Sequence, residues 1–196
     1  MAYIVSDQAL GFVDLYLVDT IGPGALKLSG SAIAYGRLEW PGMILRGYDN
    51  ALKSGGDFMF VQYAGTVTAG GICELTQTAD ATGGYQPSAQ AWAGGANSGK
   101  PLAVSMAGGA AGQWGWVQIG GMAVANVSGA PVAGNPVYWQ ASGVVSPTVV
   151  ASKQVLNAQF ATAPAITYGS GNAAVTLSGT QALLLLNRPC AQGAIT

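Results

Sequence analysis

The chain has 196 residues and a formal net charge of −1, and only 8% of its residues are charged whereas 50% are hydrophobic. This composition excludes intrinsic disorder, which requires many charged and few apolar residues, and no nucleic-acid partner is expected because no lysine- and arginine-rich stretch exists to neutralise phosphates. No membrane span is expected either, since a transmembrane helix needs about 20 consecutive apolar residues and the most apolar run is Ala182 to Leu186.

Residues 1–39 are the least regular part of the sequence. Tyr3 to Val5 and Phe12 to Val18 are predicted as short strands, and a Gly-Pro-Gly turn follows at residues 22–24. Because the first residues include no basic region, we expect no signal peptide. Two alternatives stay open, namely peripheral strands of the domain or an extended arm that pairs with a neighbouring subunit. We therefore separate 1–39, an N-terminal arm or peripheral strands, from 40–196, a β-rich domain.

A hairpin is predicted next. Its strands are Met43 to Tyr48 and Phe58 to Ala64, and the turn-rich stretch from Asp49 to Asp57 is its connector. A short strand follows at Ile72 to Thr76. Asp80 to Lys100 consists mostly of small and polar residues, so it is predicted as a long loop that is either functional or simply part of the surface.

Residues 102–146 have the clearest strand pattern. Glycine interrupts the short apolar runs, and Gly120-Gly121 predicts a bulge or bend. The predicted strands are Leu102 to Met106, Trp114 to Ile119, Met122 to Val127, Val137 to Ala141 and Val144 to Ser146, with a tight turn at Ser142-Gly143 between the last two.

The C-terminal part repeats this pattern. Val155 to Ala161 is predicted as a strand, and Ala173 to Leu177 and Gln181 to Leu186 as a hairpin, after which Pro189 is expected to end the last strand. Turn signals at intervals of roughly 8–12 residues are typical of sandwiches and barrels. The predicted fold is therefore all-β, with a β-sandwich or barrel-like core of short antiparallel strands and an extended N-terminal segment.

Charge is distributed unevenly along the chain. Residues 101–196 hold only Lys153 and Arg188 as charged residues. A surface with so few charges costs little to dehydrate, and the cores of protein interfaces are depleted of charge. We predict that this half of the chain packs against other protein; a neutral soluble domain is the alternative.

Catalytic chemistry is poorly represented. The chain has no histidine, which removes the commonest general base and the commonest metal ligand. Cys73 and Cys190 do not form a metal-binding motif, so we expect two small buried residues, with a disulfide left open, and neither metal nor cofactor. Asp49 and Asp57 bracket the hairpin connector and could act as an acid pair, but aspartate at such positions usually shapes a turn. We predict a protein that is not an enzyme.

Aromatic residues are the remaining candidates for recognition. Trp114 and Trp116 lie on one face of a predicted strand. If exposed, this pair would stack on sugar rings or anchor an interface; if buried, it would belong to the core. The candidate interface residues are Phe12, Leu15, Tyr16, Trp40, Arg46, Trp92, Trp114 and Trp116.

A series of short motifs runs from about residue 40 to the C-terminus. They are Gly42 to Asp49, Gly55 to Val61, Trp114 to Gly121, Gly134 to Tyr138, and Leu186 to Pro189 followed by Gln192, Ile195 and Thr196. In this order they resemble the small capsid decoration, or cement, proteins of tailed bacteriophages. Residues 1–39 and the stretch 80–100 depart from the pattern of that family.

The resemblance implies a β-rich protein, often a homotrimer, that sits on the outer shell and braces the joints between major capsid subunits. Its expected partners are further copies of itself and the major capsid protein. Its expected location is the capsid exterior of the virion, after synthesis in the cytoplasm of the bacterial host. The alternative is a glycan-binding β module of a phage tail or surface adhesin that uses Trp92, Trp114 or Trp116.

Overall fold

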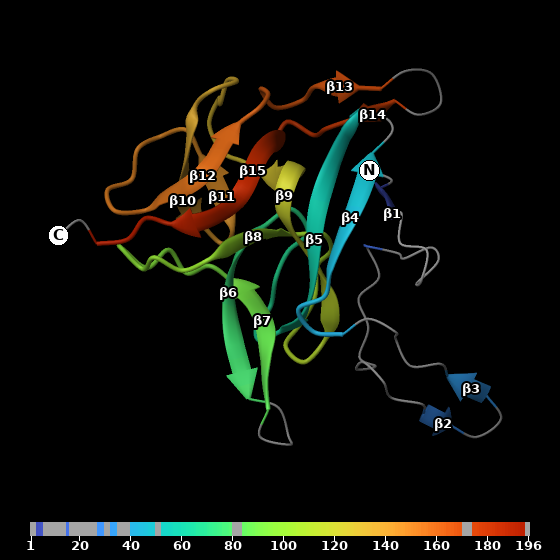
Figure 1. Cartoon of the computed structure of the whole chain (residues 1–196). Coiled ribbons are helices and arrows are strands. Elements are labelled where there is room, and N and C mark those ends of the chain that lie inside the picture. The colour runs from blue at the N-terminus through green and yellow to red at the C-terminus, as the bar shows by residue number, and fades with distance from the viewer. Residues whose placement is uncertain are drawn as a thin grey trace.

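The computed structural model describes residues 3–5, 15, 27–29, 32–34, 40–49, 52–79, 84–169 and 174–194. Within these residues it contains strands and no helix, which confirms the predicted all-β class (Figure 1). The strands are β1 Tyr3–Val5, β2 Lys27–Ser29, β3 Ala32–Ala34, β4 Ile44–Asp49, β5 Ser54–Tyr63, β6 Ile72–Ala79, β7 Tyr85–Ala91, β8 Leu102–Ser105, β9 Trp114–Asn126, β10 Pro136–Ala141, β11 Val144–Ser146, β12 Gln154–Phe160, β13 Thr167–Tyr168, β14 Val175–Thr176 and β15 Gln181–Ala191.

Part of the large sheet closes into a ring. In the order β5, β7, β6, β8 and β9 each strand pairs with the next, and β9 pairs back onto β5. A ring this small leaves room for side chains only, so its interior is a packed core. Every strand of the ring contributes to that core, which includes Val61, Tyr63, Cys73, Ala89, Ala103, Val117 and Ile119.

β9 belongs to two sets of strands because it bends in the middle. Its first half pairs with β5 and β8, and its second half pairs with β15. The bend lies at Gly120-Gly121 as predicted, where the ladder with β5 has a bulge and Gly121 has φ +83°. A Cβ atom on residue 121 would collide with the backbone of Gly55. Only glycine therefore allows β9 to cross β5 so closely.

The second half of β9 leads into a second layer, formed with β15, β12, β10 and β11. A bridge between Val127 and Val145 brings β11 back to the end of β9. The β10–β11 turn is the predicted tight turn, with φ of +49° at Ser142 and +79° at Gly143. This layer packs against the outer faces of β6 and β8 through a core that includes Ile72, Leu102, Val104, Ala123, Ala125, Val137, Val155, Phe160, Ala182, Leu184 and Leu186.

A third apolar cluster covers the outer face of β5 and the first half of β9. The ring centroid of Phe60 lies 5.7 Å from that of Trp114 and 5.2 Å from that of Trp116. Leu45 on β4 belongs to the same cluster, and so does Leu15, which is 2% exposed. Leu15 is thus a core residue of the protein.

The N-terminal predictions are tested only in part. Tyr3–Val5 is a strand as predicted, and it pairs with β4 of the same chain. Apart from Leu15, the predicted strand at 12–18 lies outside the described residues. β2 and β3 pair only with each other within the described chain.

The predicted loop at 80–100 is wrong, because it contains β7. This strand forms a hairpin with β6 and also pairs in parallel with the end of β5. Small polar side chains conceal the strand pattern: Ser88 is buried, and its hydroxyl lies 2.8 Å from that of Thr76 and 2.7 Å from that of Thr78. The connector expected between Asp49 and Asp57 is also shorter, because β5 already begins at Ser54.

The C-terminal hairpin prediction is wrong as well. A turn does form at residues 178–181, where the Gln181 amide donates to the Ser178 carbonyl. However, β14 pairs with β13, whereas β15 pairs with β9 and β12. β15 also continues past Pro189 to Ala191, and Pro189 sits where the ladder with β12 is interrupted. A proline is tolerated at such an interruption because no ladder hydrogen bond is lost.

We expect the crossing of β9 over β5 to be sensitive to one methyl group. Gly121 and Gly134 have φ of +83° and +86°, so alanine strains the backbone at both, by about 1 kcal/mol. Nothing lies within 4 Å of a Cβ on residue 134. Gly121→Ala should therefore lower the free energy of unfolding in urea by about 2 kcal/mol more than Gly134→Ala. Equal losses would show that the two strands do not cross this closely.

Candidate protein-interaction face

Three of the candidate interface residues are core side chains. Trp92, Trp114 and Trp116 are 1%, 6% and 0% exposed, so their assignment to a surface is wrong. Trp114 and Trp116 face Phe60 in the third cluster, and Trp92 packs edge-on against Trp139. The interpretation of these tryptophans as sheet-core aromatics is the one that the structure supports.

The remaining candidates are divided between core and surface. Leu15 is buried in the chain's own core. Trp40 is 64% exposed, and the Arg46 side chain is 86% exposed. Phe12 and Tyr16 lie outside the described residues. Among the candidates that the structure describes, only Trp40 and Arg46 are available to a partner.

Asp49 and Asp57 do not form an acid pair. Asp57 and Arg46 are directly opposed in the β4–β5 ladder, so their side chains share one face. Asp49 is separated from Arg46 by an odd number of positions along β4, which places it on the other face. There Asp49 is buried and accepts a hydrogen bond from the Leu52 amide in the turn. The two carboxylates are separated by the sheet, and Asp49 has the turn role expected of it.

Asp57 lies in a row of residues that crosses neighbouring strands. Arg46 on β4, Asp57 on β5, Gly120 on β9 and Asn187 on β15 are successive Cα partners. Figure 1 shows these strands side by side. Side chains of directly opposed residues share a face, so this row forms one continuous surface.

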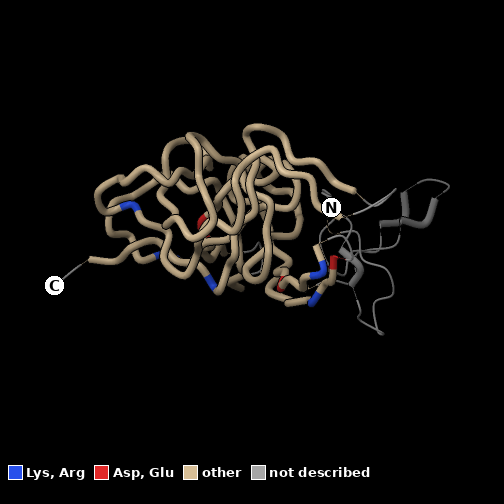
Figure 2. The backbone as a smooth tube through the Cα atoms, turned by 90° about the horizontal axis from the view of Figure 1, so that it is seen from above, with Lys and Arg blue, Asp and Glu red and all other residues tan. Residues whose placement is uncertain are grey.

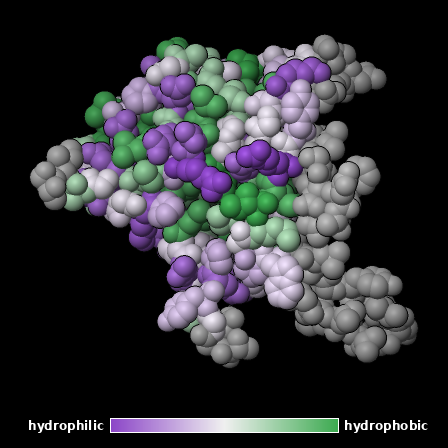
Figure 3. Space-filling model, in the orientation of Figure 1, coloured by the Kyte–Doolittle hydropathy of each residue, from purple (hydrophilic) through white to green (hydrophobic). Residues whose placement is uncertain are grey.

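Apolar side chains flank the row on both sides. Ile44 and Tyr48 on β4 are 44% and 46% exposed, and Leu185 on β15 is 42% exposed. In Figure 3 hydrophilic and hydrophobic groups lie next to one another over the middle of the molecule. We refer to this surface as the arginine face; it consists of Ile44, Arg46, Tyr48, Gly55, Asp57, Gly120, Leu185, Asn187 and Arg188.

The centre of the arginine face carries a charge cluster. Arg46 Nε donates to Asp57 Oδ1 at 3.2 Å, and Arg188 Nη2 lies 3.9 Å from Asp57 Oδ2. The two arginine side chains are 86% and 59% exposed. Exposed ion pairs contribute less than about 1 kcal/mol, so the cluster adds little to stability. Two guanidinium groups share one carboxylate, which leaves one excess positive charge and several N–H donors directed to solvent.

Arg188 has a strained backbone. It lies in the interrupted part of β15, between the pairs Ala158↔Leu186 and Leu156↔Cys190, and has φ +51°. Left-handed backbone is costly for a residue with a Cβ atom and is most readily adopted by glycine. A bulge redirects a side chain, and here the redirected guanidinium reaches Asp57. Arg188 shares this conformation with six other described non-glycine residues, one of which, Asn157 with φ +57°, lies in the same interruption of the β12–β15 ladder.

A shallow hollow of about 270 Å³ adjoins Arg46 and has a floor of glycines. Gly121 is required by the fold, because a Cβ atom there would collide with the backbone of Gly55, and at Gly56 a Cβ atom would press on the buried side chains of Gln118 and Phe58 at 2.7 and 2.9 Å. Gly55 is different: its Cβ would have a single neighbour, the Gly47 carbonyl oxygen, at an ordinary 3.5 Å. The fold itself therefore does not require glycine at position 55, although a side chain there would fill the hollow.

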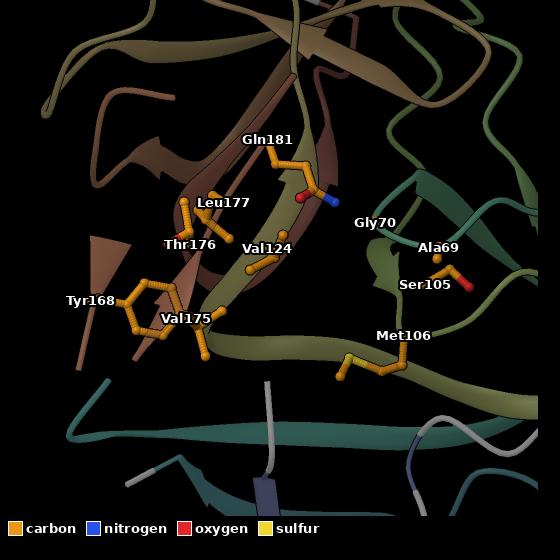
Figure 4. A pocket seen from close by; sticks show the side chains of 10 residues that line it. All are labelled: Ala69, Gly70, Ser105, Met106, Val124, Tyr168, Val175, Thr176, Leu177 and Gln181. Carbon is orange, nitrogen blue, oxygen red and sulfur yellow. The ribbon is translucent and has the colours of Figure 1, made fainter. Parts of the chain in front are cut away.

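A second cavity lies on another part of the molecule (Figure 4). It also measures about 270 Å³ and is lined by Ala69, Gly70, Ser105, Met106, Val124, Tyr168, Val175, Thr176, Leu177 and Gln181. No lining residue carries a charge at neutral pH; burial, and secondarily Asp49, raises the pKa of Tyr168 further above neutrality, to about 12. Its polar side chains are the uncharged groups of Ser105, Tyr168, Thr176 and Gln181.

Charged residues of both signs are few in the described part of the chain (Figure 2). Asp49 and Glu74 are buried, and Glu74 is paired with Lys100 at 2.9 Å. The Asp57 side chain is 27% exposed and is paired with arginine. The exposed charged side chains of the described residues are therefore all cationic, namely Arg46, Lys53, Lys100 and Arg188.

The described part of the chain offers few reactive or metal-binding side chains. Burial raises the pKa of the Cys73 thiol to about 12, so this thiol stays protonated at neutral pH. No group of three or more potential metal ligands is found among the described residues. The same residues include no helix long and apolar enough to cross a membrane.

Comparison with known proteins gives no family for the chain. No protein-family model matches the sequence, and no curated protein matches it either. The arginine face therefore has to be interpreted from its own chemistry.

We expect substitutions of Arg188 to reveal the strain at this position. In a normal strand, glycine is less stable than alanine by about 0.5–1 kcal/mol. At φ +51° the order should be reversed, with Arg188→Gly more stable than Arg188→Ala by about 1 kcal/mol in urea unfolding. The usual order would mean that residue 188 is not held in a left-handed conformation.

Proposed function

We propose that this protein is a structural subunit that decorates the outside of a bacteriophage capsid and stabilises it by bridging major capsid subunits. The observation that carries the proposal is the spatial arrangement of the sequence motifs that resemble decoration proteins. Motifs at 42–49, 55–61, 114–121 and 186–189 lie on β4, β5, β9 and β15, which are neighbours in the sheet. They supply all the residues of the arginine face except Leu185, which directly precedes the last motif.

The surface chemistry of the described residues supports the same proposal. Few charges have to be dehydrated when such a surface is covered, and the charges that are exposed have one sign. Arginine and tyrosine are enriched among the residues that dominate binding energy at interfaces. The arginine face contains arginine and tyrosine together with exposed aliphatic side chains. Protein interfaces have a similar composition, with an apolar core and a polar rim.

Many weak contacts are sufficient for this role. Each square ångström of apolar surface covered contributes about 25 cal/mol. A subunit that covers a joint between two shell proteins resists their separation at every copy, so modest contacts add up over the whole shell. This role needs no catalytic group.

The glycan-binding alternative has less support. It required an exposed platform of tryptophans, and Trp92, Trp114 and Trp116 are buried. The described aromatic side chains that remain exposed are Trp40, Tyr48 and Tyr85, which come from separate parts of the chain.

The proposal is tested by adding the purified chain to heads of a phage whose gene for this protein has been deleted. We expect electron microscopy to show regularly spaced extra density on the outside of the shell, and we expect decorated heads to release DNA at a higher temperature than bare heads. A Gly55→Leu variant should bind less well, whereas Gly179→Leu, at a site where a Cβ would have no neighbour within 4 Å, should bind normally. Heads that stay bare with the wild-type chain would refute the proposal.

A further inference from the structure

We propose that the arginine face binds an acidic segment of the major capsid protein, whose carboxylates pair with Arg46 and Arg188. This inference rests on the proposed function and deepens it, because it names the chemistry of the surface to which the protein binds. Three observations carry it: the unused donors of the two arginines, an amide-lined hollow that continues the arginine face, and the sign of the exposed charges.

The two arginines use few of their hydrogen-bond donors within their own chain. A guanidinium group has five N–H donors. Of the donors on Arg46 and Arg188, only Arg46 Nε forms a hydrogen bond to a described residue, with Asp57 Oδ1 as the acceptor. Arg188 Nη2 lies 3.9 Å from Asp57 Oδ2, which is too far for a hydrogen bond. Because both side chains are mostly exposed, the other donors are accessible to a carboxylate, which a guanidinium binds through two parallel hydrogen bonds.

Asp57 keeps the two guanidinium groups together but neutralises only one of their two charges. Space is left beside its carboxylate, because the residue opposite on β9 is Gly120, where a Cβ atom would lie 3.3 Å from Asp57 Oδ2. The net charge of the cluster is therefore +1. A second carboxylate, supplied by a partner, would balance it.

A second hollow continues the arginine face towards β12. It has a volume of about 250 Å³, shares Leu185 and Asn187 with the arginine face, and is also lined by Asn157 and Gln159. The amide side chains of these three polar residues form no hydrogen bond to any described residue. A primary amide both donates and accepts, so it can pair with the peptide groups of another chain. This surface therefore suits a segment of protein better than a single small anion.

The length of the segment follows from the spacing of the strands. The two hollows lie at opposite ends of the row from Arg46 to Asn187, which crosses β4, β5, β9 and β15. Neighbouring strands are about 4.8 Å apart, so the row is about 14 Å long. An extended chain advances by about 3.3 Å per residue, so a segment of about five residues reaches from one hollow to the other.

The charges of the described residues favour a different protein over a second copy of this chain. If two arginine faces met, two cationic clusters would oppose each other, which is unfavourable. Other described surfaces of a second copy offer no exposed carboxylate, because Asp49 and Glu74 are buried and Asp57 belongs to the arginine face itself. The major capsid protein of the proposed function is thus the partner on which we expect the acidic segment.

The test measures the affinity of the purified chain for heads of the phage that lacks its gene, by co-sedimentation at low and high salt. We expect affinity to fall as salt rises, and a chain with both Arg46→Gln and Arg188→Gln to have a dissociation constant at least about tenfold higher. Asp57→Asn should bind more tightly than the wild type, because it keeps the oxygen that accepts from Arg46 but removes the competing negative charge.

The matched control is Lys153→Gln, which removes a positive charge outside the arginine face, where Lys153 lies over the Trp139 ring. It should bind like the wild type, and all variants should unfold in urea close to the wild-type midpoint. Unchanged binding of the double arginine variant, or weaker binding of Asp57→Asn, would overturn this inference and leave the proposed function standing. Heads that stay bare with the wild-type chain would overturn both.

Sedimentation velocity without heads provides the test of a second copy as the partner. We expect the oligomeric state of the purified chain to be the same for the wild type and for the double arginine variant. Self-association that is lost in that variant would show that another copy of the chain occupies the arginine face, and the inference would be wrong.

Discussion

The structure depends on the close crossing of β9 over β5 at Gly121. At this position there is no space for a side chain, because the Gly55 backbone occupies it. The crossing lets the first half of β9 complete the ring with β5 and β8 while its second half begins the layer with β15. β9 therefore contributes side chains to both cores: its first half to the core inside the ring, and its second half to the core under the second layer.

The same crossing creates the arginine face. Because β9 bends at Gly120-Gly121, it pairs there with both β5 and β15. The row of paired residues from Arg46 to Asn187 therefore crosses all four strands without a break. Little of that face is needed for folding: its ion pairs are exposed, Gly55 has no steric requirement for glycine, and Arg188 is strained. These features support the proposed contact of this face with other protein.

Sequence reasoning was most successful where local chemistry decides the structure. The Gly120-Gly121 bend and the Ser142-Gly143 turn follow from glycine and turn preferences within a few residues. β7 was missed because its buried positions hold Ser88 and Ala89 in place of large apolar groups, and because it contains Pro87. β15 was assigned to the wrong partner because turn signals at 178–179 say where the chain reverses but not which strand it joins. The arginine face was only partly foreseen: Arg46 was a candidate, but its pairing with Asp57 depends on the hairpin register, and the position of Arg188 depends on a bulge between distant strands.

The central claim is that the arginine face is covered when the protein performs its function. Hydroxyl-radical footprinting of the dilute chain and of the same chain bound to phage heads tests it directly, because modification of a side chain reports its exposure to solvent. The account predicts that modification of Tyr48 and Leu185 falls several-fold on the heads while that of Val149 is unchanged. Equal modification of Tyr48 and Leu185 in the two states would contradict it.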